Sequence, residues 1–215
     1  LSSPFDYRKN SLIYVEKQMP DPKSPAFAGA LAVRCAEMIK ASGGGVFALF
    51  TSYELMKNTH KALSGRFPEL NMLIQGEAAP NKLIEKFRAS PSVLFATNTF
   101  WQGIDIKGDA LRCVIITRLP FEVPEHPLQK AVYEHVVKNG GNDFSEIALP
   151  RAIFMLKQGF GRLIRSKEDY GVVAILDSRV ATKGYGRLFI NALPEAEITH
   201  KVEDVEAFFR RKRGQ

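Results

Sequence analysis

The chain has 215 residues, of which 45% are hydrophobic and 25% charged; this composition is typical of one packed globular domain and excludes disordered and fibrous classes. No run approaches the roughly 18 consecutive apolar residues that cross a bilayer, and the first residues carry no secretory signal, so we expect a cytoplasmic protein without a membrane partner. The formal net charge of +7 suits a polyanion such as nucleic acid without requiring one.

Short apolar strands alternate with helical stretches along the chain. A strand is predicted over residues 12–15, followed after a helix at 26–41 by strands at 46–50, 72–74, 93–96, 111–116 and 172–176. Further helices are predicted over residues 53–63, 82–89 and 147–165. The basic run at residues 210–213 is interpreted as a solvated, frayed terminus rather than a DNA contact.

Runs within these predicted strands, such as Val-Ile-Ile and Val-Leu-Phe-Ala, are apolar at every position, which is the pattern of parallel strands covered by helices on both faces. We therefore predict an α/β fold with a doubly wound, mostly parallel sheet flanked by helices, as a single domain over residues 1–215. Such sheets bind ligands outside the carboxyl ends of their strands, so the loops that follow strands are candidate sites. Cys35 and Cys113 lie in apolar stretches, and the four histidines lack the spacing of metal ligands, so no metal site is predicted.

The helix at 147–165 has one apolar stripe and one polar face. Its apolar residues recur at steps of three and four: Leu149, Ala152, Ile153, Leu156, Phe160 and Leu163. Relative to Leu149, Gln158 lies at about 180°, Arg162 at about 220° and Arg165 at about 160°, so these three side chains share the outer face. An ordinary amphipathic helix also places polar residues there, so the stripe alone does not identify a site.

Two glycines, Gly159 and Gly161, interrupt this helical pattern. Each costs about 1 kcal/mol relative to alanine inside a helix, which favours the close approach of a ligand or another backbone. The run that contains them is Gln158-Gly159-Phe160-Gly161-Arg162-Leu163-Ile164-Arg165. It resembles motif VI of superfamily 2 helicases, in the form found in the DinG and XPD-like branch.

The resemblance implies a RecA-like second motor domain of an ATP-dependent DNA helicase. In that family this helix faces ATP and Mg²⁺ held mainly by the first motor domain, and Arg162 and Arg165 correspond to arginine fingers, with Gln158 beside them. The chemistry favours arginine because phosphoryl transfer spreads negative charge over equatorial oxygens, and a planar guanidinium binds two oxygens at once.

A polar loop follows the strand at 93–96 and carries hydroxyls, an amide and two adjacent aromatic rings. Such groups at a strand end can hold phosphates, and exposed rings can stack on bases, although burial of Phe100 and Trp101 is an equally good interpretation. Residues 97–108 resemble motif V of the same branch. The resemblance implies that Gly103 and Asp105 lie near the nucleotide. It assigns the DNA contacts to Thr97, Asn98, Thr99, Phe100 and Trp101.

Shorter signals agree with this family. Thr51 and Ser52 end a strand and start a helix, in the manner of motif IV, and are candidate phosphate contacts, although a plain helix N-cap explains Ser52 equally well. Gln75, after the next strand, is a further candidate for DNA contact. The sequence Asp177-Ser178-Arg179 is interpreted as a structural salt bridge near the strand ends.

The sequence contains no Gly-x-x-x-x-Gly-Lys-Ser/Thr phosphate loop, so the chain alone is not expected to hydrolyse ATP. The resemblance assigns that loop to the first motor domain of the same polypeptide, together with the iron–sulfur cluster of many relatives. It also implies single-stranded DNA as partner, a monomer, a nucleoid-associated location and a role in DNA repair. Two alternatives stay open: a degenerate motor domain that only binds nucleic acid, for example attached to a nuclease, and an unrelated small-molecule-binding α/β domain.

Overall fold

Seven parallel strands form the centre of the structure, a computed structural model that describes residues 5–97, 100, 110–122, 124, 126–164, 166 and 168–214. The strand order across the sheet is β3-β4-β2-β5-β6-β1-β7. Their bounds are β1 Ser11–Val15, β2 Val46–Phe50, β3 Asn71–Ile74, β4 Ser92–Thr97, β5 Cys113–Ile116, β6 Gly171–Ile175 and β7 Glu197–Thr199. The predicted doubly wound parallel sheet is confirmed.

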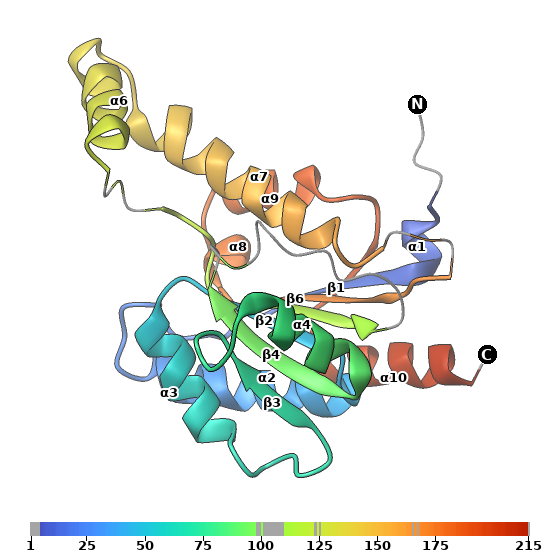
Figure 1. The fold of residues 1–215 in the computed structure, drawn as a ribbon. Coiled ribbons are helices and arrows are strands. Elements are labelled where there is room, and N and C mark those ends of the chain that lie inside the picture. Colours follow the sequence, from blue (N-terminus) through green and yellow to red (C-terminus); the bar gives the residue numbers. More distant parts are fainter. Residues whose placement is uncertain are drawn as a thin grey trace.

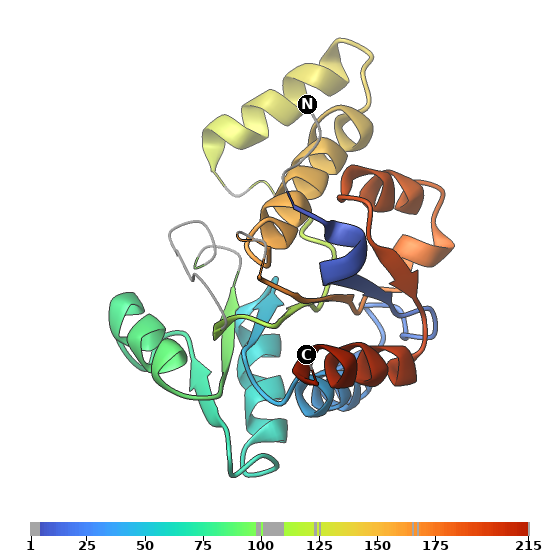
Figure 2. The same ribbon diagram turned by 90° about the vertical axis from the view of Figure 1, so that its right-hand side faces the viewer.

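Helices cover both faces of this sheet (Figures 1 and 2). One face packs against α2 (Phe27–Ser42), α3 (Tyr53–Leu63) and α10 (Val202–Arg213); the other packs against α4 (Pro80–Ala89), α7 (Leu149–Phe160), α8 (Arg179–Thr182) and α9 (Gly186–Ala192). Successive strand residues point to opposite faces. In β1, Leu12 and Tyr14 therefore join one apolar cluster, and Ile13 and Val15 join the other.

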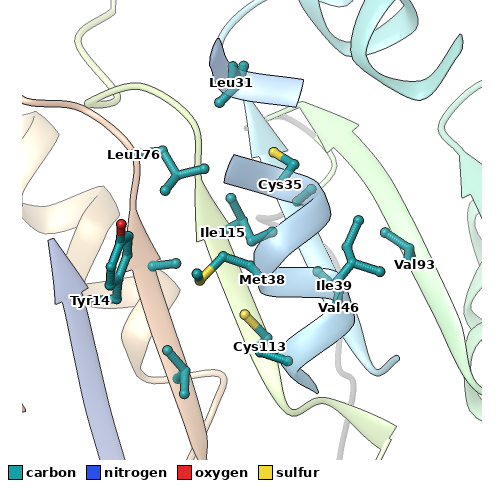
Figure 3. Packing of buried hydrophobic residues seen from close by; sticks show 14 of the residues in the cluster. Tyr14, Leu31, Cys35, Met38, Ile39, Val46, Val93, Cys113, Ile115 and Leu176 are labelled. Carbon is teal, nitrogen blue, oxygen red and sulfur yellow. The ribbon is translucent and has the colours of Figure 1, made fainter. Parts of the chain in front are cut away.

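The core on the α2 side shows how these strands and helices hold together (Figure 3). Met38 and Ile39 of α2 lie over Val46 and Ile115 of the sheet, and all four side chains are fully buried. Burying a side chain of this size contributes about 1.5–3 kcal/mol. Cys113 is also buried in this cluster and carries a free thiol, as expected from its apolar surroundings.

The predicted helix at 147–165 differs from the structure at both ends. It begins with a π-helical turn, Phe144–Ala148, continues as α7 and ends at Phe160. Gly161 is therefore the C-cap rather than an interior residue, so a helix-interior cost does not apply to it. The predicted apolar stripe is confirmed: its members are buried except for the partly buried Ile153.

The basic run at residues 210–213 forms the last turn of α10, so its interpretation as a frayed terminus is wrong. Phe208 and Phe209 on the preceding turn are buried in the core. Arg213 donates a hydrogen bond to the carbonyl of Ala41 (2.8 Å), and Lys212 donates one to the side chain of Asn10 (2.8 Å). Apolar anchoring therefore orders a segment whose charge alone suggested disorder.

Two further helices lie in the described part of the chain. Helix α1 (Tyr7–Asn10) precedes β1, and helix α6 (Pro127–Lys138) stands away from the sheet with the first part of α7 (Figure 1). No residue of α6 is buried. Among the described residues, no helix is long and apolar enough to span a membrane.

Candidate nucleotide and nucleic-acid interface

Gln158 and Arg162 line one open cavity of about 420 Å³ on the outer side of α7. Glu122, Arg151, Phe154 and Met155 form the rest of its described wall. Both Gln158 and Arg162 are partly exposed, whereas Leu156 and Phe160 on the opposite side are buried in the core. The predicted separation of a polar and an apolar side of this helix therefore places an amide and a guanidinium at one cavity.

This arginine pocket extends along α7. At one end, Glu122 of its wall belongs to the segment that follows the carboxyl end of β5. At the other end, Leu163, next to Arg162, packs against the first residue of β6, Gly171, where an added Cβ atom would come within 2.5 Å of the Leu163 side chain. Phe160 contacts Tyr7 of α1, which precedes β1 (ring centroids 5.6 Å). The pocket is therefore not confined to the loops at the carboxyl edge, where the general rule places ligands.

Gly161 is the exposed C-cap of α7 and precedes Arg162 in the chain. Its φ of −64° is open to any residue, and a Cβ atom there would make only ordinary contacts of 3.4 Å and 3.7 Å with the carbonyl oxygens of Lys157 and Gln158. Neither the described backbone nor the described packing therefore requires glycine at this position. The absence of a side chain leaves room for a group from outside the chain.

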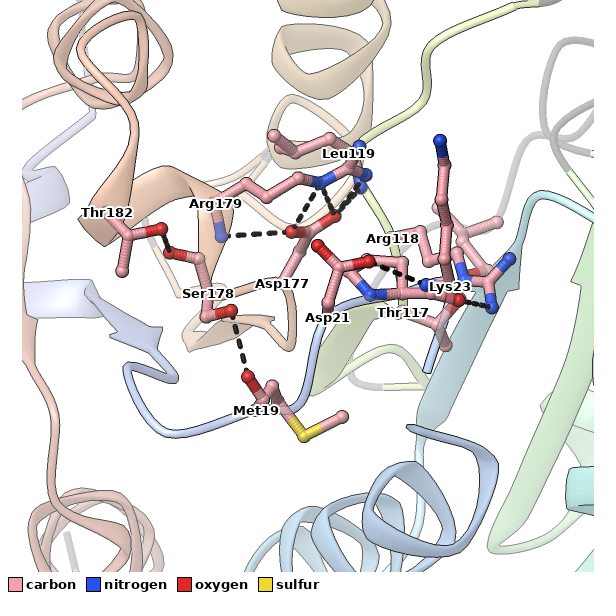
Figure 4. Close-up of polar contacts among 12 residues, drawn as sticks. Met19, Asp21, Lys23, Thr117, Arg118, Leu119, Asp177, Ser178, Arg179 and Thr182 are labelled. Carbon is pink, nitrogen blue, oxygen red and sulfur yellow. Dashed lines mark hydrogen bonds and ion pairs between the residues drawn. The ribbon is translucent and has the colours of Figure 1, made fainter. Parts of the chain in front are cut away.

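A buried ion pair fixes the loop that brings Glu122 to the arginine pocket (Figure 4). The Asp177 carboxylate is fully buried and accepts hydrogen bonds from the Leu119 N–H (2.7 Å) and from the Arg179 guanidinium (2.6–3.2 Å). Arg179 in turn lies over the Phe121 ring, 5.5 Å from its centroid. The predicted structural salt bridge is confirmed, and the contacts of Asp177 with Leu119 and of Arg179 with Phe121 tie the end of β6 to the segment after β5.

The carboxyl edge of the sheet holds a second group of polar side chains. The Gln75 side-chain oxygen Oε1 accepts hydrogen bonds from the Thr97 N–H (2.8 Å) and the Thr97 hydroxyl (3.0 Å). Thr97, a predicted DNA contact, is itself buried at 6% exposure, so its hydroxyl faces Gln75 and not solvent. The Gln75 amide nitrogen donates to the Tyr53 hydroxyl (2.6 Å). Because β3 and β4 are neighbours, Gln75 bridges the ends of two strands and orients the exposed Tyr53 ring. A neighbouring cavity of about 440 Å³ is lined by Tyr53, Gln75 and Lys57 among others.

The end of β2 lies next in this row because β2 pairs with β4. Thr51 is exposed there. Ser52 is the N-cap of α3, and its hydroxyl accepts a hydrogen bond from the Leu55 N–H (3.2 Å), so capping accounts for its position. Phe100 is buried at 8% exposure and packs against Phe47, so its ring does not offer a face to a base. Of the two interpretations of Phe100, burial is therefore the correct one.

Several predicted site residues lie outside the described residues. They are Asn98, Thr99, Trp101, Gly103, Asp105 and Arg165. Within the described ranges, no group of three or more histidine, cysteine, aspartate or glutamate side chains is arranged to hold a metal ion. The site that the structure does describe therefore consists of an arginine-bearing cavity on one face and a polar row at the carboxyl edge.

Comparison with known families identifies the family of this domain. Residues 35–196 match the model of the helicase C-terminal domain. The chain belongs to that family. It is a DinG- and XPD-like helicase C-terminal domain, and the matched range includes both the arginine pocket and the polar row.

Curated relatives extend this match over the rest of the chain. The ATP-dependent DNA helicase YoaA of Haemophilus influenzae is 39% identical over 213 residues, which cover 99% of this chain and 33% of that protein. The 3'-5' exonuclease DinG of Bacillus subtilis is 37% identical over 97% of this chain and 23% of its own length. The ATP-dependent helicase DinG of Mycobacterium tuberculosis is 38% identical over 98% of this chain and 32% of its own length. The helicase domain thus spans about a third or less of the length of these relatives.

Solved structures support the same fold at lower identity. An XPD helicase superimposes with a TM-score of 0.69 at 19% identity, covering 88% of this chain and 36% of that one. Xpd4 of S. tokodaii gives a TM-score of 0.64 at 16% identity, covering 88% and 38%. These likenesses confirm the predicted RecA-like fold.

The helicase domain also has site residues that the sequence did not indicate. Tyr53 was predicted only as the first residue of a helix, and its hydrogen bond to Gln75 depends on the pairing of β3 with β4 and β4 with β2. Arg151 lines the same cavity as Arg162 and precedes it by eleven residues. The sequence signal that could have indicated Arg151 is the helical spacing from Gln158 back through Met155 to Arg151.

Proposed function

We propose that this helicase C-terminal domain is the second motor domain of an ATP-dependent DNA helicase, and that it supplies arginine fingers to an ATP site shared with a first motor domain. The observation that carries the proposal is the placement of Gln158 and Arg162 on one open cavity, in a chain that belongs to the helicase C-terminal family. In this proposal Arg165 is the second finger, and the motif resemblance assigns Gly103 and Asp105 to the nucleotide.

The residues of the arginine pocket suit a triphosphate. A guanidinium donates two parallel hydrogen bonds to phosphate oxygens and keeps its charge at all physiological pH values. As water attacks the γ-phosphorus and the bond to the β,γ-bridging oxygen breaks, negative charge spreads over the equatorial oxygens, where Arg162 and Arg165 stabilise it. Gln158 donates an amide hydrogen bond at the same cavity. Mg²⁺ and most phosphate contacts are assigned to the first motor domain.

The polar row at the carboxyl edge is proposed to hold single-stranded DNA. The hydroxyl of Thr51 and the side-chain amide of Gln75 contact the phosphate backbone without reading sequence, and the exposed ring of Tyr53 offers a stacking face. Thr97 is buried and donates to Gln75, so it positions that side chain rather than contacting DNA itself. Asn98, Thr99 and Trp101 are assigned to the same contact by the motif resemblance. ATP shifts the equilibrium between open and closed arrangements of the two motor domains toward the closed one, because a ligand favours the state that it binds more tightly. This closure then changes the affinity of the domains for DNA.

Substitution of Arg162 in the full-length enzyme tests the ATP half of this proposal. Removing an arginine finger reduces turnover by about 10³–10⁵-fold, so Arg162→Ala is expected to abolish DNA-stimulated ATP hydrolysis while single-stranded DNA binding persists. Arg187→Ala is the control, because Arg187 is exposed on α9 and does not line the arginine pocket. DNA-stimulated hydrolysis at the unmodified rate in Arg162→Ala would refute the finger assignment.

A second candidate function is a nucleic-acid-binding module attached to a nuclease. The name of the B. subtilis relative, 3'-5' exonuclease DinG, favours this alternative for part of the family. It predicts that the full-length protein degrades DNA without ATP and that Arg162→Ala leaves this degradation unchanged. ATP-dependent strand separation by the full-length protein, lost in Arg162→Ala, selects the motor function instead.

A further inference from the structure

The loop between β1 and α2 crosses the carboxyl edge of the sheet. Ser178, which follows β6, donates a hydrogen bond to the Met19 carbonyl (3.0 Å), and Arg118, which follows β5, donates one to the Pro22 carbonyl (2.6 Å). The loop therefore runs from the end of β1 over β6 to the end of β5 (Figure 4). Lys23 is the next residue, so it lies beside the end of β5 although its own strand is two positions away.

This position continues the polar row described above. Strand β5 pairs with β2, and β2 pairs with β4, so the exposed Thr51 at the end of β2 lies between Lys23 at the end of β5 and Gln75, which is hydrogen-bonded to the buried Thr97 at the end of β4. Neighbouring strands are about 4.8 Å apart, which spaces these strand ends at intervals that an extended backbone of phosphodiesters can follow.

Local hydrogen bonds hold the loop in one conformation. The Asp21 carboxylate accepts from the Lys23 N–H (2.8 Å), and the Asp21 carbonyl accepts from the Ser24 N–H (2.8 Å). Three prolines in the segment further restrict the backbone: Pro20, Pro22 and Pro25. A ligand that binds there does not have to order the loop, so less binding free energy is lost to conformational entropy.

The charge of Lys23 is available for a ligand. Its side chain is exposed and makes no ion pair or side-chain hydrogen bond with any residue in the described ranges. The neighbouring cations have partners: Arg179 pairs with Asp177, and Arg118 lies 4.6 Å over the Phe27 ring. The exposed Asp21 carboxylate interacts electrostatically with both Arg118 and Arg179. Lys23 is thus the cation of this cluster with no described partner.

We propose that Lys23 binds a phosphodiester of single-stranded DNA and extends the nucleic-acid contact from the ends of β4 and β2 across the end of β5. The proposal rests on the DNA-binding half of the proposed function and adds one phosphate contact to it. Because a lysine contacts a phosphate as a point charge, the contact contributes affinity and salt dependence without base preference.

Fluorescence anisotropy with a labelled oligo-dT tests this contact in the 215-residue chain, whose two apolar clusters are built from its own residues. For single strands, each phosphate contact contributes about 0.7 to the slope of log affinity against log salt. Lys23→Gln is therefore expected to reduce that slope by about 0.7. The corresponding loss of affinity is about eightfold at 50 mM salt and about threefold at 200 mM.

Lys40→Gln is the matched control. Lys40 is exposed in the last turn of α2, which ends at the opposite edge of the sheet, and its substitution removes the same charge. A slope reduced in Lys23→Gln but unchanged in Lys40→Gln supports the proposal. Equal slopes in both variants overturn it while the proposed function stands, provided that Gln75→Ala weakens binding. Absence of oligo-dT binding by the unmodified chain refutes both the Lys23 contact and the DNA-binding half of the proposed function.

Discussion

Removal of the Asp177 carboxylate tests whether this buried group holds the end of β6 to the segment after β5. Asp177→Ala leaves the Leu119 N–H without its acceptor, which costs about 1–3 kcal/mol, and leaves Arg179 without its counter-ion. Breaking a buried pair costs about 3–5 kcal/mol, and the 26% exposure of the Arg179 side chain, which allows partial hydration, favours the lower end. We expect the free energy of unfolding to fall by about 3 kcal/mol. For a chain of this size the melting temperature then falls by about 6–12 °C.

Urea unfolding monitored by circular dichroism measures this change. Glu195→Ala serves as the control because it breaks the Arg8–Glu195 ion pair, whose side chains are 76% and 81% exposed, and it is expected to leave the midpoint unchanged. A loss below about 1 kcal/mol in Asp177→Ala would show that the pair does not contribute to the stability of this edge.

Three further outcomes follow from packing and burial. Gly186→Ala is expected to unfold the chain or lower its melting temperature severely, because an added Cβ atom would lie 1.9 Å from the Val180 carbonyl oxygen; near-native melting of the variant would contradict this contact. Gly161→Ala should leave the melting temperature unchanged but slow DNA-stimulated ATP hydrolysis in the full-length enzyme, and a fall in stability would instead assign Gly161 a structural role. Burial raises the pKa of Cys35, and raises that of Cys113 to about 12, so both thiolates are absent at pH 8 and a thiol reagent should react only after urea is added; rapid labelling of the native chain would refute this.

Local sequence signals predicted most of the fold. The bounds of α3, Tyr53–Leu63, followed from the Ser52 cap and the helical periodicity, and each predicted strand is present within two residues of its expected bounds. Strand β7 was missed because its three residues pair with β1, more than 180 positions earlier, and no local pattern encodes such a contact. The order of α10 was missed because the charge of its last turn outweighed the apolar spacing of Val205, Phe208 and Phe209.

The candidate site likewise has one part that could be predicted from the sequence and one part that could not. The common side of Gln158 and Arg162 followed from helical geometry, which depends only on their spacing in the sequence. The role of Tyr53 could not be predicted, because its hydroxyl meets Gln75 only through the order of three strands. Burial of Phe100 depends equally on tertiary packing, since the sequence alone gave two adjacent aromatic residues without a direction for either ring.

The arginine pocket follows α7, whereas the polar row lies at the carboxyl ends of β3, β4 and β2, so the two features occupy different parts of one domain. A five-residue strand is about 17 Å long, so a rotation about its amino end displaces its carboxyl end by about 0.3 Å per degree. Successive nucleotides rise by about 3.4 Å along one strand of DNA, a distance that a rotation of roughly 11° would cover. Under the proposed function, a change of angle of that size between two motor domains would be sufficient to move the bound DNA by one nucleotide.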